Sequence, residues 1–191
     1  MSDTSRAALP HAAPLEGTTV LSSALWILLF AAATALGARV EIPHAPVPYT
    51  LQTLVVMLAG AFLGARNGAI SQFAYLTAGA LGAPVFAAGG AGIITFVGPT
   101  GGYLAAFPLA AAVVGLLTAN RASLVRSFLA MAAGLLVIFT LGTLHLYAFT
   151  LHDFSAAFTS GFLIFSWWDM VKLGAAAMTY YEVAKRWKRV G

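Results

Sequence analysis

Two residues of opposite charge, Asp169 and Lys172, lie within an otherwise apolar stretch, residues 158–178. This stretch is long enough to cross a bilayer as a helix, where a central charge costs roughly 2.5–3.5 kcal/mol on insertion scales. A spacing of three places both side chains on one helix face, where they can neutralise each other. An ionised carboxylate only accepts hydrogen bonds and an ammonium only donates them. The pair predicts an intramembrane ligand site; the alternative is an ion pair that merely locks the helix.

Other reactive groups are scarce. The chain has no cysteine, which excludes disulfides and thiolate chemistry. Its four histidines lack the spacing of metal ligands, and there is no G-x-x-x-x-G-K-[ST] phosphate loop. The few polar residues supply no set of nucleophile, base and acid. We therefore expect no metal, no cofactor and no enzymatic activity.

The composition is that of an integral membrane protein. Hydrophobic residues make up 60% of the 191 residues, and charged residues make up 8%. A soluble domain carries about 25% charged residues, so this chain lacks the polar surface that a water-soluble globule needs. Helices rather than a barrel are predicted, because glycine and alanine recur at helical spacing and no alternating ten-residue strands are present.

Hydropathy predicts an all-α bundle of six transmembrane helices. The apolar segments lie near residues 19–38, 50–65, 68–83, 100–118, 125–149 and 158–182. The second and third are short and flank the turn Gly64 to Gly68, which indicates a hairpin of two close-packed helices. The predicted domains are a disordered cytoplasmic tail at 1–17, a six-helix substrate-binding domain at 18–184 and a basic cytoplasmic tail at 185–191.

The basic residues predict the orientation in the membrane. Of the ten Lys and Arg residues, Lys172 alone falls within a segment, and Arg39 alone falls on the side opposite to the remaining eight. The other eight share one side: Arg6, Arg66, Arg121, Arg126, Lys185, Arg186, Lys188 and Arg189. The positive-inside rule therefore places both termini in the cytoplasm. We interpret the basic tail as a topology anchor at the lipid bilayer and not as a nucleic-acid site.

Two unusual loops fall on the external side. Residues 40–49 contain three prolines, which make a stiff, non-helical connection. Residues 84–103 are apolar, rich in glycine and uncharged. Irregular backbone at a membrane is tolerated where it lines a cavity or packs within protein, so this loop is predicted to be a lid or re-entrant piece. The alternative is that its glycines only permit tight turns.

Two stretches of sequence resemble the BioY family. They are PVPYTLQTLVVMLAGAFLGARNGAISQFAYLTAGALGAPVFA at 46–87 and FVGPTGGYLAAF at 96–107. BioY proteins are the substrate-binding S components of energy-coupling factor (ECF) biotin transporters. The resemblance implies six helices in a prokaryotic cell membrane and capture of biotin from the external side. It also implies partners: a transmembrane coupling protein and two cytoplasmic ATPase subunits.

The family's sixth helix carries a Gly-Asp-x-x-Lys pattern, which Asp169 and Lys172 match. Trp168 replaces the glycine, which affects the local packing and pocket width. His145 stands where the family has an apolar aromatic residue, and we expect it to be satisfied by a backbone carbonyl rather than by ligand.

Further site residues follow from the chemistry of biotin. Asp169 suits a ureido N–H, and Lys172 suits either the ureido oxygen or the carboxylate. A helix amino terminus at Gly98 to Tyr103 is predicted to receive the carboxylate, while aromatic residues either hold the apolar part or serve as membrane-belt anchors. Thr50 either lines the mouth or caps a helix. The predicted substrate site is Asp169, Lys172, Thr50, Tyr75, Phe86, Gly98, Thr100, Tyr103 and Phe165.

Ala31 and Ala35 lie four residues apart in the first segment, a spacing of small residues that permits close helix contact. In the resembled family such a face docks on the coupling protein; the alternative is packing within the bundle. For the whole chain, the alternatives to a biotin S component are an S component for another vitamin or a stand-alone proton-coupled importer. An intramembrane enzyme or a scaffold subunit is the rival from another class.

Overall fold

The computed structural model describes residues 20–119, 123–163 and 167–187. The predicted tail at 1–17 lies outside these residues, as do the last four residues of the basic tail. The longer helices are α1 (Val20–Arg39), α2 (Gln52–Ala80), α3 (Gly101–Thr118), α4 (Leu124–Leu146) and α6 (Trp167–Trp187). The shorter elements are β1 (Glu41–Ile42), β2 (Tyr49–Thr50), η1 (Ala87–Gly89), η2 (Ile93–Phe96), η3 (Tyr147–Leu151), α5 (Phe154–Ala157) and η4 (Phe158–Phe162).

Helix α2 is a hairpin folded at Gly64. This glycine adopts φ 75° and ψ 176°, which breaks the helix and reverses the chain. A Cβ added to Gly68 would lie 2.9 Å from the Cα of Gly60, so the two arms touch backbone to backbone. The predicted hairpin is thus confirmed, because residues eight apart in a straight helix would be about 12 Å apart.

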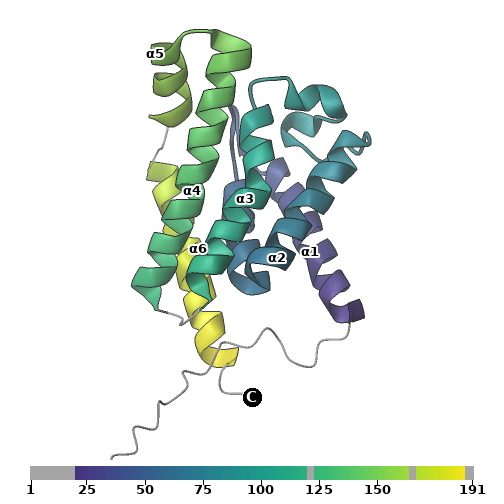
Figure 1. Cartoon of the computed structure of the whole chain (residues 1–191), viewed down its shortest axis with the longest axis vertical. Helices are drawn as coiled ribbons and strands as arrows, with labels where there is room; N and C mark the ends of the chain where they lie inside the picture. The colour runs from purple at the N-terminus through teal and green to yellow at the C-terminus, as the bar shows by residue number, and fades with distance from the viewer. Residues whose placement is uncertain (1–19, 120–122, 164–166, 188–191) are drawn as a thin grey trace, which may run out of the picture.

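The helices form one bundle with the loops gathered at one end (Figure 1). Four of the described helical stretches are long and apolar enough to cross a membrane: Val20–Arg39, Gln52–Ala80, Gly101–Thr118 and Leu124–Leu151. With α2 counted as two arms and α6 added, the chain passes through the bundle six times, as the sequence predicts.

The sixth segment, predicted at 158–182, is described in two pieces. The helical turns of α5 and η4 run to Phe162, and α6 is described from Trp167 to Trp187. Residues 164–166, between these pieces, lie outside the described residues.

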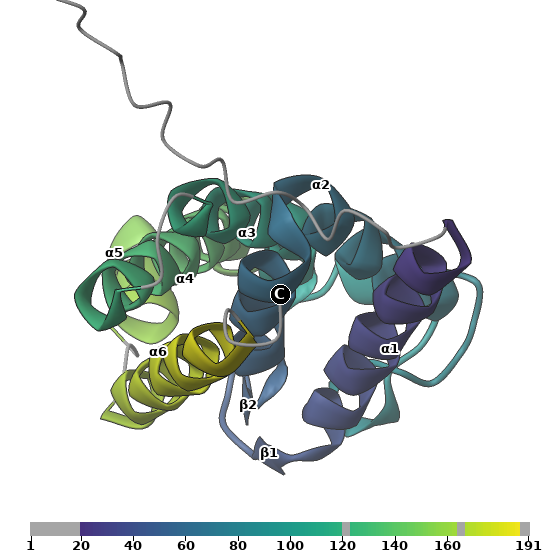
Figure 2. The same ribbon diagram turned by 90° about the horizontal axis from the view of Figure 1, so that it is seen from below.

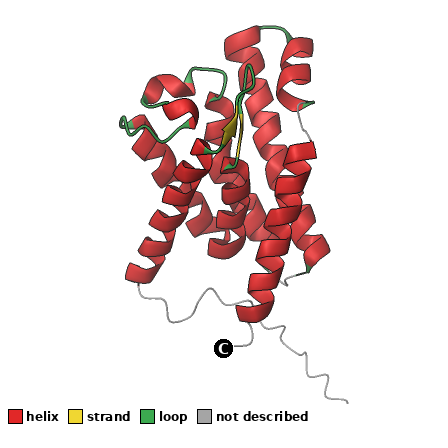
Figure 3. Ribbon diagram, turned by 180° about the vertical axis from the view of Figure 1, so that it is seen from behind, coloured by secondary structure: helices red, strands yellow, loops and turns green. Residues whose placement is uncertain are grey.

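The ends of the bundle differ in character. Helix α1 begins and α6 ends at the same end, opposite to the loops (Figure 1). At the loop end β1 and β2 pair antiparallel, with Glu41 opposite Thr50 and Ile42 opposite Tyr49 (Figure 3). Helix α3 packs against α2 and α4 in the core, whereas α1 stands at the margin of the bundle (Figure 2). This arrangement brings β2, the start of α2 and α6 to one region.

We predict that Gly60→Ala destabilises the protein. The added Cβ would collide with the carbonyl group of Ala111 in α3, and such overpacking costs about 1–3 kcal/mol. Thermal unfolding of the detergent-purified variant, followed by circular dichroism, should show a lowered midpoint. Gly174→Ala is the matched control, because a Cβ at Gly174 in α6 meets nothing within 4 Å. Equal midpoints for both variants would contradict the close contact of α2 with α3.

Candidate functional site

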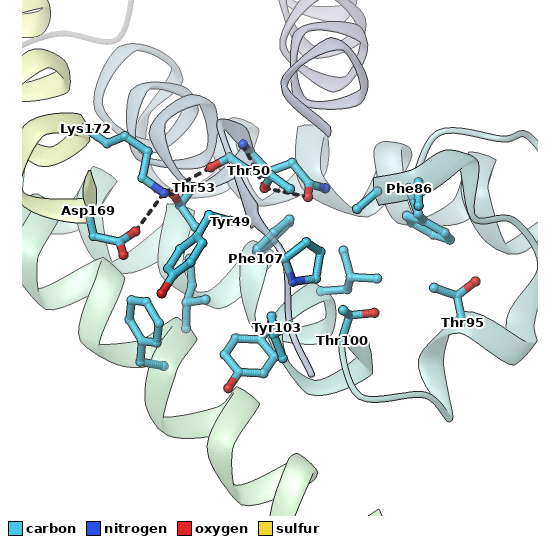
Figure 4. Close-up of a pocket in the computed structure, with 18 residues that line it drawn as sticks. Tyr49, Thr50, Thr53, Phe86, Thr95, Thr100, Tyr103, Phe107, Asp169 and Lys172 are labelled. Carbon is cyan, nitrogen blue, oxygen red and sulfur yellow. Dashed lines mark hydrogen bonds and ion pairs between the residues drawn. The ribbon is translucent and has the colours of Figure 1, made fainter. Parts of the chain in front are cut away.

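A cavity of about 230 Å³ lies near the loop end of the bundle. Its wall is formed by β2, the first turn of α2, the loop around η1 and η2, and helices α3, α4 and α6 (Figure 4). Drug-sized ligands occupy pockets of roughly 300–1,000 Å³, so this cavity suits a compact small molecule. Most of its lining is apolar, and the charged side chains in it are Asp169 and Lys172.

The charged pair is buried and in direct contact. Lys172 Nζ lies 2.7 Å from Asp169 Oδ1, and the two side chains are 5% and 2% exposed. Lys172 Nζ also donates to the Thr50 carbonyl at 3.0 Å and to Thr53 Oγ1 at 2.9 Å. An ammonium has three N–H donors, and all three therefore find acceptors within the protein. Lys172 thus ties α6 to the junction of β2 and α2.

Tyr49 of β2 lies beside this pair and also lines the cavity (Figure 4). Burial, and to a lesser degree the negative charge of Asp169, raises the pKa of the Tyr49 phenol above its ordinary value. The phenol therefore stays protonated and can donate a hydrogen bond at neutral pH. His44 packs on the outer side of Tyr49, with ring centroids 5.1 Å apart. Neither Tyr49 nor Thr53 was predicted to belong to the site.

A polar chain links the cavity wall to the loop. The Thr50 hydroxyl donates to Gln52 Oε1 at 2.9 Å and accepts from the Gln52 N–H at 3.3 Å. Gln52 Nε2 donates to the Tyr75 hydroxyl at 2.5 Å, and that hydroxyl donates to the Val85 carbonyl at 3.2 Å. Thr50 therefore lines the cavity and binds the N–H of Gln52, whereas the N-cap position of α2 is Leu51.

Aromatic rings build the apolar wall. Phe86 is 1% exposed and meets Tyr75 edge-on at 5.5 Å and Phe96 at 5.6 Å. Phe107 stacks on Tyr75 at 6.4 Å. Elsewhere in the wall Tyr103 donates to the Gly161 carbonyl at 3.0 Å, which fixes its ring within the site. The rings of Tyr75, Phe86, Tyr103 and Phe107 are buried inside the bundle and therefore do not act as membrane-belt anchors.

Six of the nine predicted substrate-site residues line the cavity: Asp169, Lys172, Thr50, Phe86, Thr100 and Tyr103. Tyr75 stands behind the wall and supports it through Gln52 and Phe86. Gly98 is not among the residues that line the cavity, and its carbonyl faces His145 Nε2 at 3.1 Å. The expectation that a backbone carbonyl satisfies His145 is thereby confirmed. Phe165 lies outside the described residues.

The amino terminus of α3 reaches the cavity at Thr100. Thr100 occupies the N-cap position, yet its side chain makes no capping hydrogen bond. The Gly101 N–H donates to the Gly98 carbonyl at 3.0 Å. A Cβ on Gly102 would collide with the His145 side chain, so α3 and α4 pack closely at this point. Thr100 and Asp169 lie on different sides of the same cavity (Figure 4).

The predicted docking pair on α1 faces inward. Ala31 is 9% exposed and belongs to the hydrophobic core, and Ala35 packs against that core. Thr34, on the same face, approaches Gln72 of α2 at 3.4 Å. The burial of this face favours the alternative of packing within the bundle, and a docking role for the two alanines stays a prediction.

Comparison with known proteins places the chain in a family. The sequence profile of the BioY family matches residues 9–189. The chain belongs to the BioY family. It is 40% identical over 157 residues to the biotin transporter BioY of Thermotoga maritima, covering 82% of this chain and 92% of that one. It is 41% identical over 152 residues to a probable biotin transporter BioY of Pyrococcus horikoshii, covering 80% and 90%.

A solved crystal structure supports the fold. The S-component for biotin from an ECF-type ABC transporter superposes on this BioY-family chain with a TM-score of 0.80. The match covers 88% of this chain and 95% of the other, at 23% sequence identity. The predicted BioY resemblance and the helical membrane fold are confirmed. The relatives are prokaryotic and are named as transporters rather than enzymes, in agreement with the prediction of a non-enzymatic membrane protein.

We predict that Lys172→Met destabilises this BioY protein strongly. Removing the ammonium leaves the Asp169 carboxylate buried without its charge partner, which costs about 3–5 kcal/mol. The double variant Asp169→Asn/Lys172→Met should recover much of this loss, because no unpaired charge then remains. Thermal unfolding in detergent measures both changes. An equal or larger loss in the double variant would show that the hydrogen bonds to Thr50 and Thr53 matter more than charge balance.

Proposed function

We propose that this protein captures biotin at the external side of the membrane as the S component of an ECF transporter and leaves it chemically unchanged. The observation that carries the proposal is the buried Asp169–Lys172 pair, which opens onto a small-molecule cavity in a protein of the BioY family. Ionisable residues inside a membrane bundle mark ligand sites by default. The relatives named as biotin transporters supply the identity of the ligand.

Asp169 is the proposed partner of the ureido ring. A carboxylate offers about four lone-pair sites, so Asp169 can accept a ureido N–H while it remains paired with Lys172. A charge-assisted hydrogen bond is roughly twice as strong as a neutral one. Lys172 reaches a ligand oxygen only by giving up one of its bonds to Thr50 or Thr53. Its main contribution is therefore to keep Asp169 ionised and in place.

The remainder of biotin is proposed to extend along the aromatic wall. Phe86, Phe107 and Tyr103 offer apolar surface for the thioether bicycle and the valerate chain. The carboxylate then lies at the amino terminus of α3, where Thr100 lines the cavity with a hydroxyl that makes no capping bond. Backbone N–H groups and the helix dipole favour an anion there.

Transport is proposed to need partners: a transmembrane coupling protein and two cytoplasmic ATPase subunits. The chain itself carries no phosphate-binding loop. We expect both termini to lie in the cytoplasm, in keeping with the positive-inside rule. The start of α1 and the end of α6 both lie at the end of the bundle opposite to the loops, which agrees with that orientation (Figure 1).

Calorimetric titration of the detergent-solubilised chain with biotin tests the proposal. We expect tight binding by the parent and at least tenfold weaker binding by Asp169→Asn, because a hydrogen bond to a charged group contributes about 1.5–3 kcal/mol. Asp153→Asn is the matched control. Asp153 is exposed and caps α5 through the Ala156 N–H at 3.0 Å, a bond that asparagine can also make. Absence of binding by the parent would refute biotin as the ligand, and equal binding by Asp169→Asn would leave the ion pair a purely structural role.

The position of the carboxylate is tested with biotin methyl ester. We expect the ester to bind at least tenfold more weakly than biotin, since it lacks the charge that the α3 terminus favours. The same titration with Thr100→Val separates the hydroxyl from the backbone N–H groups as donors. Equal affinity for ester and acid would place the carboxylate away from α3.

A further inference from the structure

Two charged residues at the loop end hold the backbone of a distant segment. Arg39, the last residue of α1, donates from its guanidinium to the Pro84 carbonyl. Glu41, in β1, accepts the Ala88 N–H on its carboxylate at 2.8 Å. The two side chains therefore bind backbone groups at opposite ends of the segment 84–88. Arg39 is also the cation that the positive-inside pattern leaves on the external side.

Three backbone hydrogen bonds lie within the segment 84–90. The Phe86 N–H donates to the Gly90 carbonyl at 3.1 Å, and the Gly89 N–H donates to the Phe86 carbonyl at 3.2 Å. The Gly90 N–H donates to the Ala87 carbonyl at 2.9 Å. These three bonds stay intact when the turn moves as a unit, whereas the Val85 carbonyl is bound from the bundle by the Tyr75 hydroxyl at 3.2 Å.

The same segment forms part of the cavity wall. Phe86, Ala87 and Ala88 all line the cavity. Ala88 adopts φ 52°, the left-handed region that non-glycine residues rarely occupy, and its N–H is the group that Glu41 holds. The contacts of Arg39 and Glu41 are exposed at the surface, on the outer side of this wall. The wall is thus fastened from outside by two side chains of another part of the chain.

We propose that Arg39 and Glu41 form a clasp that holds the segment 84–90 over the cavity and controls the rate at which ligand enters and leaves. Both are positioning residues, because they bind the wall and do not themselves line the cavity. The rest of the wall is formed mainly by membrane-spanning helices and by residues 47–50, which Lys172 of α6 holds through the Thr50 carbonyl, so displacement of the segment 84–90 is the least costly way to open the cavity to the external side. That the ligand is biotin rests on the proposed function. The binding of the segment by Arg39 and Glu41 does not.

Hydrogen exchange of the full-length protein in detergent, without biotin, tests the fastening. We expect Glu41→Ala and Arg39→Ala to speed exchange in the peptide 84–90 by about fivefold, the effect of losing one net hydrogen bond. Exchange in α3 should stay at the parent rate. Glu41→Gln should stay close to the parent, because its side-chain oxygen still accepts from Ala88. Glu182→Ala and Arg66→Ala, exposed and away from the loop end, are the charge-matched controls. Unchanged exchange in 84–90 would overturn the clasp.

Biotin association and dissociation rates of the same variants test the control of access. We expect both rate constants to rise by about fivefold in Glu41→Ala, with a nearly constant ratio, because the clasp must release in either direction. Faster exchange with unchanged biotin rates would overturn the role in access. If the parent binds no biotin, the proposed function fails, and the exchange experiment alone decides whether the clasp holds the segment.

Discussion

The structure depends on the way in which the Lys172 ammonium is neutralised inside the bundle. A buried charge is tolerated only with a partner and with its remaining donors satisfied. Lys172 meets this requirement with Asp169 from its own helix and with Thr50 and Thr53 from the start of α2. One side chain thereby fixes α6, the loop strand β2 and α2 relative to one another, and it does so at the edge of the cavity. Stability and the proposed ligand recognition therefore share the same atoms.

This constraint orders the rest of the site. Because the Thr50 carbonyl is held by Lys172, the Thr50 hydroxyl is directed to Gln52, and Gln52 in turn reaches Tyr75. The Tyr75 hydroxyl then donates to the carbonyl of Val85, which lies in the loop after α2 and next to Phe86 of the cavity wall. The hairpin at Gly64 makes this possible, since it brings Gln52 and Tyr75, which stand near opposite ends of α2, side by side. The polar chain and the clasp at Arg39 and Glu41 thus act on the same loop from inside and from outside.

Much of this arrangement is predictable from the sequence, for physical reasons. Asp169 and Lys172 are predictable as site residues because they are charges in an apolar segment. The hairpin is predictable because glycines flank an arginine between two short apolar segments. Thr53 and Tyr49 escape prediction because their roles depend on contacts with α6, more than a hundred residues away in the chain. The small-residue spacing of Ala31 and Ala35 shows that a helix packs there but not which one. The clasp is equally invisible, because its targets are backbone groups that carry no residue-type signal.

The most direct test of the account is a crystal structure of the protein with biotin bound. We expect the ureido ring within hydrogen-bonding distance of Asp169, the bicycle against Phe107 and Tyr103, and Lys172 still bonded to Asp169. Biotin bound elsewhere, with the ion pair intact and out of contact with the ligand, would contradict the claim that this pair is the recognition site.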